Sequence, residues 1–224
     1  MHCPCMDHGG QQKRVVLTGG PGAGKTAVLE LVRHRLCRHV RILPESAGIL
    51  FGGGFPRDGQ LEVRRAAQRA IFYLQRELET AHAASDAAVL LCDRGTIDGL
   101  AYWPGPGDLF AAVGARREEE LARYQAVIHL RTPTANGGYD RSNPLRVESP
   151  AEAAAIDRRI AEAWVGHPNI LVIDCEPDFL AKARRALDVL AAQLPACCRP
   201  VPLAPLDAAR MSHPLLSQNP GGTS

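Results

Sequence analysis

The chain has 224 residues, of which 46% are hydrophobic and 22% charged, and its formal net charge is +2. This balance is typical of a globular protein of one or two domains, and so small a net charge does not indicate binding to nucleic acid or to an acidic membrane surface. No apolar run approaches the roughly 18 residues of a membrane span, and the N-terminus lacks the basic and apolar regions of a signal peptide. We therefore expect a cytoplasmic protein whose partners include neither nucleic acid nor a membrane.

The seven cysteines are odd in number and scattered along the chain. This pattern suits a reducing compartment and does not make a disulfide framework. Cys92 and Cys175 lie in apolar runs, and we expect both to be small buried side chains. Four N-terminal residues could be drawn as a metal cluster, although their spacing matches no standard zinc module: His2, Cys3, Cys5 and His8.

A glycine-rich segment at residues 19–26 separates an expected strand, 15–18, from an expected helix, 25–38. It reads GGPGAGKT and matches the full G-x-x-x-x-G-K-[ST] pattern of a phosphate-binding P-loop. In such a loop, backbone N–H groups point at phosphate oxygens, and the helix adds the positive end of its dipole. Lys25 should contact the β- and γ-phosphates, and Thr26 should offer its hydroxyl to Mg²⁺. The residues expected to bind the nucleotide are Gly19, Gly20, Pro21, Gly22, Ala23, Gly24, Lys25, Thr26 and Ala27.

The basic residues support this interpretation of Lys25. Of the 26 lysines and arginines, only three are lysine: Lys13, Lys25 and Lys182. An ammonium point charge and a planar guanidinium are not interchangeable at a tight phosphate site. A chain that uses arginine almost everywhere else has a lysine where the motif needs one.

The next expected strand, residues 40–43, ends at Glu45. A carboxylate at this place could take a proton from an acceptor hydroxyl; the alternatives are a helix cap or an ion pair. A glycine-rich loop at 52–59 follows, and apolar residues at helical spacing then predict a long helix over 61–84.

A continuous apolar run at residues 87–92 predicts a strand that is buried on both faces. Asp93 follows it directly. In P-loop proteins an acid at this place holds Mg²⁺, often through water, whereas the alternative is a surface residue that caps a helix near Thr96. Short helices are expected at 97–103 and 117–124.

A fourth strand is expected at residues 126–130, and a polar loop at about 131–150 follows it. Guanidinium groups on a mobile loop can stabilise charge on a transferring phosphoryl group and exclude water. With 23 arginines in the chain, chance placement is the alternative. The candidates in or next to this loop are Arg131, Arg141 and Arg146.

The last expected elements are a helix at 150–165, a strand at 169–173 and a helix at 177–194. Pro, Gly and Ser dominate from residue 195, and the apolar pattern stops there. We therefore expect a flexible N-terminus at 1–12, one nucleotide-binding domain at 13–194, and a disordered tail at 195–224.

Five strands alternating with helices predict an α/β fold, with a mostly parallel sheet covered on both faces. Right-handed crossovers bring the carboxyl end of every strand to one edge, where ligands bind in open sheets of this kind. The P-loop, Glu45, Asp93, the arginine loop and Asp174 each follow one strand there. This convergence predicts an active site at that edge of the sheet.

Five segments resemble the AAA-type ATP/GTP-binding P-loop proteins, over about residues 13–192 of the chain. That group includes the ribosylnicotinamide kinase domain of bacterial NadR proteins and the nucleotide-binding domain of the insect TRPL translocation defect protein. The third and fourth segments are more specific than the P-loop and favour the translocation-defect branch. The segments are 17–26 (LTGGPGAGKT), 44–45 (PE), 92–98 (CDRGTID), 143–148 (NPLRVE) and 167–174 (HPNILVID).

Nucleoside and thymidylate kinases carry a similar acid–arginine pair after the third strand. That resemblance implies that Arg94 contacts the acceptor or its neighbouring carboxylate, and that residues 143–146 belong to a lid. The chain departs from the insect protein in having no second domain after the P-loop domain, and from NadR in having no adenylyltransferase half. We therefore expect no membrane-lipid binding.

The resulting hypothesis is a small-molecule or nucleoside-type kinase that uses Mg-ATP or Mg-GTP, with an acceptor still to be identified. The alternatives are a regulatory module, whose 131–150 loop is ordered differently by triphosphate and diphosphate, and a plain ATPase or GTPase. No guanine-reading Asn/Thr-Lys-x-Asp motif separates ATP from GTP.

Overall fold

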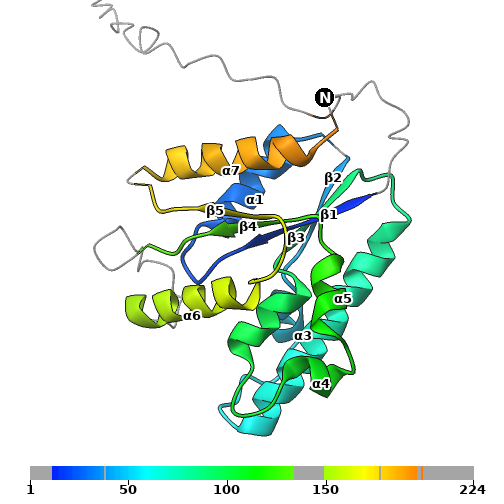
Figure 1. The fold of residues 1–224 in the computed structure, drawn as a ribbon, viewed down its shortest axis with the longest axis vertical. Coiled ribbons are helices and arrows are strands. Elements are labelled where there is room, and N and C mark those ends of the chain that lie inside the picture. The colour runs from blue at the N-terminus through cyan, green and yellow to red at the C-terminus, as the bar shows by residue number, and fades with distance from the viewer. Residues whose placement is uncertain (1–11, 38, 134–148, 177, 196–197, 199–224) are drawn as a thin grey trace, which may run out of the picture.

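The computed structural model describes residues 12–37, 39–133, 149–176, 178–195 and 198. Its centre is a five-stranded sheet in the order β2-β3-β1-β4-β5, in which every neighbouring pair is parallel (Figure 1). The predicted α/β class is confirmed, and the sheet is parallel throughout. The strands are β1 (Lys13–Thr18), β2 (Val40–Leu43), β3 (Val89–Asp93), β4 (Ala126–Leu130) and β5 (Ile170–Ile173).

Helices cover both faces of the sheet. In Figure 1, α1 and α7 lie together on one face, and α3, α4, α5 and α6 lie on the other. The helices are α1 (Lys25–Arg35), α2 (Ser46–Gly52), α3 (Leu61–Ala83), the 3₁₀ helix η1 (Thr96–Tyr102), α4 (Leu109–Val113), α5 (Arg117–Ala122), α6 (Pro150–Ala163) and α7 (Phe179–Gln193).

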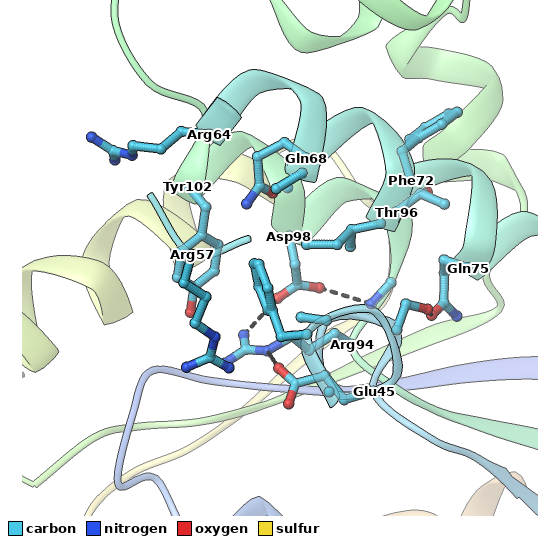
Figure 2. Close-up of a pocket in the computed structure, with 18 of the residues that line it drawn as sticks. Glu45, Arg57, Arg64, Gln68, Phe72, Gln75, Arg94, Thr96, Asp98 and Tyr102 are labelled. Atoms are coloured by element: carbon cyan, nitrogen blue, oxygen red, sulfur yellow. Dashed lines mark hydrogen bonds and ion pairs between the residues drawn. The ribbon is translucent and has the colours of Figure 1, made fainter. Parts of the chain in front are cut away.

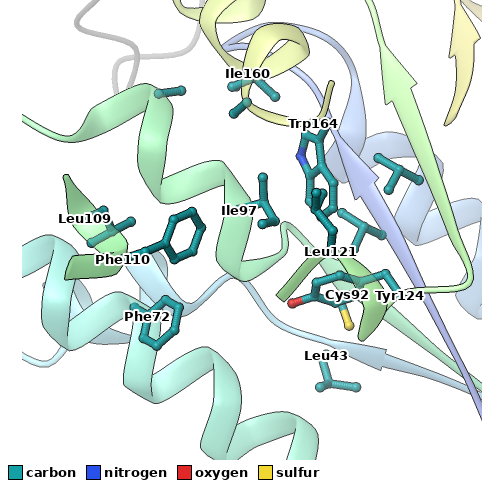
Figure 3. Close-up of a cluster of buried hydrophobic side chains, with 14 of the residues drawn as sticks. Leu43, Phe72, Cys92, Ile97, Leu109, Phe110, Leu121, Tyr124, Ile160 and Trp164 are labelled. Atoms are coloured by element: carbon teal, nitrogen blue, oxygen red, sulfur yellow. The ribbon is translucent and has the colours of Figure 1, made fainter. Parts of the chain in front are cut away.

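The two layers of helices bury two separate hydrophobic clusters against the sheet. On the α3–α6 side, Trp164 lies edge-on to Tyr124, with ring centroids 5.5 Å apart, and Phe72 lies edge-on to Phe110 (Figure 3). On the other side, aliphatic residues of α1 and α7 pack on β1, β3 and β4. Strands that are buried on both faces explain the continuous apolar runs in the sequence.

Several local expectations differ from the structure. Residues 46–52 form α2 and residues 109–113 form α4, although neither helix was expected. Cys92 is fully buried, as predicted, but Cys175 is exposed because it lies beyond the end of β5. The prediction that Cys175 is a buried side chain is therefore wrong.

The two expected terminal segments, 1–12 and 195–224, lie almost wholly outside the described residues. Two of their described residues do contact the domain. The Gln12 side chain donates a hydrogen bond to the Ala87 carbonyl at 3.0 Å, and Cys198 is 3% exposed and belongs to the α1–α7 core cluster. In the part of the chain that the structure describes, no helix is long and apolar enough to span a membrane.

Candidate functional site

The P-loop follows β1 and leads into α1, as the motif requires. Gly24 has a φ of 93° and precedes the first residue of α1, so the chain enters the helix from a left-handed conformation that favours glycine. Gly19 has a φ of 139°, and a Cβ atom there would lie 2.1 Å from the Leu130 carbonyl oxygen. The loop therefore packs so tightly on the end of β4 that only glycine is possible at position 19.

A buried carboxylate anchors the P-loop from the α3–α6 side of the sheet. Asp157 of α6 accepts hydrogen bonds from the Gly20 backbone N–H at 2.9 Å and from Thr132 Oγ1 at 3.3 Å. His129 Nε2 and Arg131 Nη1 lie 3.0 and 3.3 Å from its two oxygens. Burial opposes ionisation of Asp157, but these hydrogen bonds and charges outweigh it and lower the pKa to about 2.

A buried lysine holds the loop from the opposite face of the sheet. Lys182 of α7 is 4% exposed, and its ammonium donates to the carbonyl oxygens of Ala23 at 2.9 Å and of Arg131 at 2.5 Å. Burial lowers the pKa of Lys182. Because Asp157 and Lys182 come from α6 and α7, helices on both faces fix the P-loop.

Lys25 bonds to the loop itself. Its Nζ lies 2.9 Å from the Gly19 carbonyl oxygen and 3.3 Å from that of Gly20. Burial and the neighbouring Arg94 charge lower its pKa to about 8, although Asp93 and Glu45 oppose the shift. The ammonium thus lies in a partly desolvated place beside a guanidinium, where an anionic ligand would favour its charged form.

Asp93 and Thr26 provide oxygen atoms suited to Mg²⁺. Asp93 Oδ1 is buried and has no hydrogen-bond partner among the described residues. Burial raises the pKa of this carboxyl from 3.8 to about 6, while Lys25 opposes the shift. Thr26 exposes its side chain in the first turn of α1. A carboxylate and a hydroxyl are ligands that Mg²⁺ prefers, so the residues fit this ion.

The acid at the end of β2 is joined to the arginine after β3. Arg94 Nε donates to Glu45 Oε1 at 2.6 Å, and Arg94 Nη1 lies 3.4 Å from Asp98 Oδ1 (Figure 2). Burial opposes ionisation of Glu45, but the charges of Arg94 and Lys25 hold its pKa below the usual value. Glu45 makes no side-chain cap to α2; the ion pair is its observed contact.

The backbone of Arg94 is itself constrained. Its φ is 73°, in the left-handed region that a bulky residue rarely adopts, and its N–H donates to the Leu17 carbonyl at 3.1 Å. Asp98 accepts hydrogen bonds from the Gly95 N–H at 2.9 Å and from the Thr18 hydroxyl. Strain of this kind concentrates at functional sites. This backbone conformation places the Arg94 guanidinium between the Glu45 and Asp98 carboxylates. The Cζ atom of Arg94 lies 5.4 Å from the centroid of the Tyr102 ring.

A pocket of 660 Å³ opens above this ion pair (Figure 2). Pro21 of the P-loop is part of its wall, so the pocket is continuous with the phosphate site. Its floor carries Glu45, Arg94 and Asp98, and its sides carry aromatic and amide groups. These include Phe51, Gln68, Phe72, Gln75 and Tyr102.

The structure brings together most of the expected site residues. Lys25, Glu45, Asp93 and Arg94 form one electrostatically coupled group. Arg131 pairs with Asp157 and supports the loop. Arg141 and Arg146 lie outside the described residues.

Three buried residues of the site were not expected from the sequence: Asp98, Asp157 and Lys182. Their partners are 80, 137 and 159 residues away along the chain, at Thr18, Gly20 and Ala23. The rarity of lysine in this chain could have indicated Lys182, because it is one of only three lysines.

Comparisons with known proteins agree with this geometry. No curated protein sequence matches the chain, so the resemblance to the insect translocation defect protein stays a prediction. The solved structure of NadR protein in complex with NR superposes with a TM-score of 0.60 at 16% identity, over 88% of this chain and 54% of the NadR chain. This chain thus spans about half the length of NadR, and the likeness shows a shared fold. A family profile described as AAA domain matches residues 14–181, which is most of the chain. The chain therefore belongs to this AAA domain family of P-loop nucleotide-binding proteins.

Proposed function

We propose that this protein transfers the γ-phosphoryl group of Mg-ATP or Mg-GTP to a hydroxyl group of a small acceptor bound in the Glu45–Arg94 pocket. The observation that carries the proposal is a cavity of 660 Å³ beside the P-loop, with Pro21 of the loop in its wall. A protein that only hydrolyses or senses a nucleotide has no need of such a cavity. A kinase needs one, because the acceptor must reach the γ-phosphate in line with the leaving group.

The side chains of the candidate site have separate roles in the proposed transfer. Lys25 leaves its loop carbonyls and binds the β- and γ-phosphates, while Thr26 and Asp93 would hold Mg²⁺. When bound, the ion neutralises charge on the phosphate oxygens. Glu45 uses one carboxylate oxygen for Arg94, and the other can accept a hydrogen bond from the acceptor hydroxyl.

The pocket wall favours an acceptor with both a flat and a polar part. Phe51 and Tyr102 offer ring faces, and the amide of Gln68 offers a paired donor and acceptor. Ser46 Oγ donates to Gln75 Oε1 at 2.7 Å, and Gln75 Nε2 donates to Glu79 at 3.0 Å, which fixes this amide. The NadR chain of the same fold was solved in complex with NR, and this supports a small organic acceptor here.

The test is an acceptor screen with purified protein. Mg-ATP and Mg-GTP are incubated with a panel of nucleosides and small metabolites, and phosphorylated products are detected by mass. We expect a product that requires both an acceptor and Mg²⁺. Arg94→Ala should raise the acceptor KM or lower kcat by at least about tenfold, since it removes a charged hydrogen-bond donor. Arg159→Ala, at an exposed position of α6, is the matched control.

Two results would contradict the kinase proposal. Release of inorganic phosphate at the same rate with and without every acceptor would indicate a plain NTPase. Nucleotide binding without any turnover, together with nucleotide-dependent capture of a partner, would indicate a regulatory module.

A further inference from the structure

Two cysteines and a histidine converge at the edge of the sheet opposite the nucleotide site. Cys37 and His39 lie in the connection between α1 and β2, and Cys198 follows α7. Their ligand atoms all lie within 4.8 Å of one another. The P-loop follows the carboxyl end of β1, whereas these residues lie beside the amino end of β2, so the cluster is separate from the proposed reaction.

Local structure presents the three side chains to one point. The Val40 N–H donates to the Cys37 carbonyl at 3.1 Å, which turns the chain after α1. The His39 carbonyl accepts from the N–H groups of Ala88 and Val89 at 2.8 and 3.0 Å, which anchors it to the start of β3. Cys198 is brought close because α7 packs beside α1 (Figure 1), and its N–H donates to the Pro195 carbonyl at 2.9 Å.

The two distances from the histidine nitrogen to the sulfurs match those of a tetrahedral metal site. His39 Nδ1 lies 3.7 Å from Cys37 Sγ and 3.5 Å from Cys198 Sγ. A tetrahedral Zn²⁺, with bonds of about 2.3 Å to sulfur and 2.0–2.1 Å to nitrogen, places such a pair of ligands about 3.6 Å apart. Both sulfurs thus already stand at the ligand spacing from a single ring nitrogen.

The chemistry of the donors selects the ion. Two thiolates and one imidazole are a soft set that suits Zn²⁺ and not Mg²⁺ or Ca²⁺. His39 and Cys198 are each 3% exposed, and Cys37 is half-buried, so a bound ion would be shielded on most sides and reachable from the Cys37 side.

We propose that Cys37, His39 and Cys198 bind a Zn²⁺ ion that fastens the segment after α7 to the α1–β2 connection. The neutral His39 ring binds through Nδ1, and both thiols release their protons on binding. Water or another donor completes the fourth position. The ion joins residues that are 161 positions apart in the chain and stabilises the face on which Lys182 holds the P-loop.

The experiment measures zinc in full-length protein purified without a polyhistidine tag or chelator. Elemental analysis should find about one zinc per chain in the wild type and in Cys175→Ser, whose exposed thiol is the matched control. Cys37→Ser and Cys198→Ser should each weaken zinc binding by more than the 10–100-fold typical of losing an outer-shell partner. Zinc at about 100 times its Kd should raise the Tm of the stripped wild-type protein by about 5–10 °C.

Two further proteins separate this site from other metal binding. Cys3→Ser/Cys5→Ser should keep the full zinc content, and so should Lys25→Ala, because the nucleotide site lies at the other edge of the sheet. Cobalt substitution should give a thiolate charge-transfer absorption that Cys198→Ser diminishes.

Three outcomes would overturn the proposal. The first is wild-type protein that takes up no zinc, since the contacts would then be only S–H···N hydrogen bonds. The second is zinc binding that survives both single substitutions. The third is a Cys37–Cys198 disulfide in non-reducing peptide maps of the freshly purified protein, which would make the pair a redox cross-link.

Discussion

Asp93 shows a conflict between the stability of the fold and the metal-binding role that we propose for this residue. Its Oδ1 atom is buried and has no hydrogen-bond partner among the described residues, and its pKa is raised to about 6 by burial. A carboxyl whose folded pKa exceeds its unfolded pKa stabilises the fold only at low pH, and that contribution is lost as pH rises through the folded value. At neutral pH the charge therefore destabilises the free protein, and Mg²⁺ would relieve this cost.

Asp93→Asn should separate these two effects. At pH 7.5 the variant should be more stable than the wild type by on the order of 1–3 kcal/mol, because a shift of one pKa unit corresponds to about 1.4 kcal/mol. The difference should shrink towards pH 4, where the wild-type carboxyl is protonated. Mg²⁺-dependent nucleotide binding should be lost. Thermal unfolding at both pH values and calorimetric titration measure these effects; a variant that is less stable yet binds Mg-nucleotide normally would make Asp93 a structural cap.

Lys25 predicts an alkaline limit to nucleotide binding. Its pKa of about 8 in the free protein is below the usual 10.5, so the ammonium loses its proton as pH rises through 8. Phosphate binds the charged form, and the affinity should fall by up to about tenfold per pH unit above that value. Titrations with Mg-ATP from pH 7 to 9.5 measure this slope. A flat profile would show that Lys25 stays charged or does not contact the phosphates.

Among single residues, sequence patterns could predict the part of the candidate site that is local in the chain. Lys25, Thr26 and Asp93 belong to short segments whose order along the chain already implies their geometry. Asp157 could not be found in this way, because its role depends on a backbone N–H that is 137 residues away. Only the packing of α6 beside the P-loop creates that contact.

The elements differ in how much of their structure is encoded locally. The inner strands β1, β3 and β4 were predictable because a parallel sheet that is covered on both faces needs continuous apolar segments there. The edge strands β2 and β5 are only partly buried, and their short apolar segments between helices indicated them. By contrast, α2 contains Gly48 and Gly52, which lower its intrinsic helix propensity. Its position is set by tertiary contacts such as the buried hydrogen bond between Ser46 and Gln75. Helix α4 has only five residues, which is too short for a periodic signal.

Helix α7 links the two ends of the sheet. Near its N-terminus, Lys182 holds the P-loop through the Ala23 carbonyl, and beyond its C-terminus Leu194 and Cys198 pack into the core. One rigid helix therefore couples the nucleotide edge to the Cys37–His39–Cys198 cluster. The sequence predicted a helix at 177–194, but a buried ammonium within it runs against the usual burial preferences.

On the scale of the whole molecule, both layers of helices support the phosphate loop, but one of them forms most of the pocket wall. The α3–α6 side supplies that wall and the Asp157 support, and the α1–α7 side supplies the Lys182 support. The parallel order β2-β3-β1-β4-β5 places Glu45, Asp93 and the P-loop on neighbouring strand ends. The fold class and this edge follow from the alternation of strands and helices. The size of the pocket does not, since it depends on how α2 and α3 pack together.

The end of the folded domain gives a last prediction at this scale. The apolar pattern of the sequence stops at residue 194, yet Cys198 is 3% exposed in the same core cluster as Leu194. A chain that ends after Leu194 should therefore lose a buried side chain, whereas a chain that ends after Cys198 should keep it. Burying a small apolar side chain contributes on the order of 1–2 kcal/mol, which corresponds to a Tm difference of roughly 2–8 °C in a domain of this size. Thermal unfolding of the two truncated proteins in the presence of chelator measures the packing alone, and repeating it with zinc adds the effect of the ion. Equal Tm values for both proteins under both conditions would show that the domain ends at Leu194.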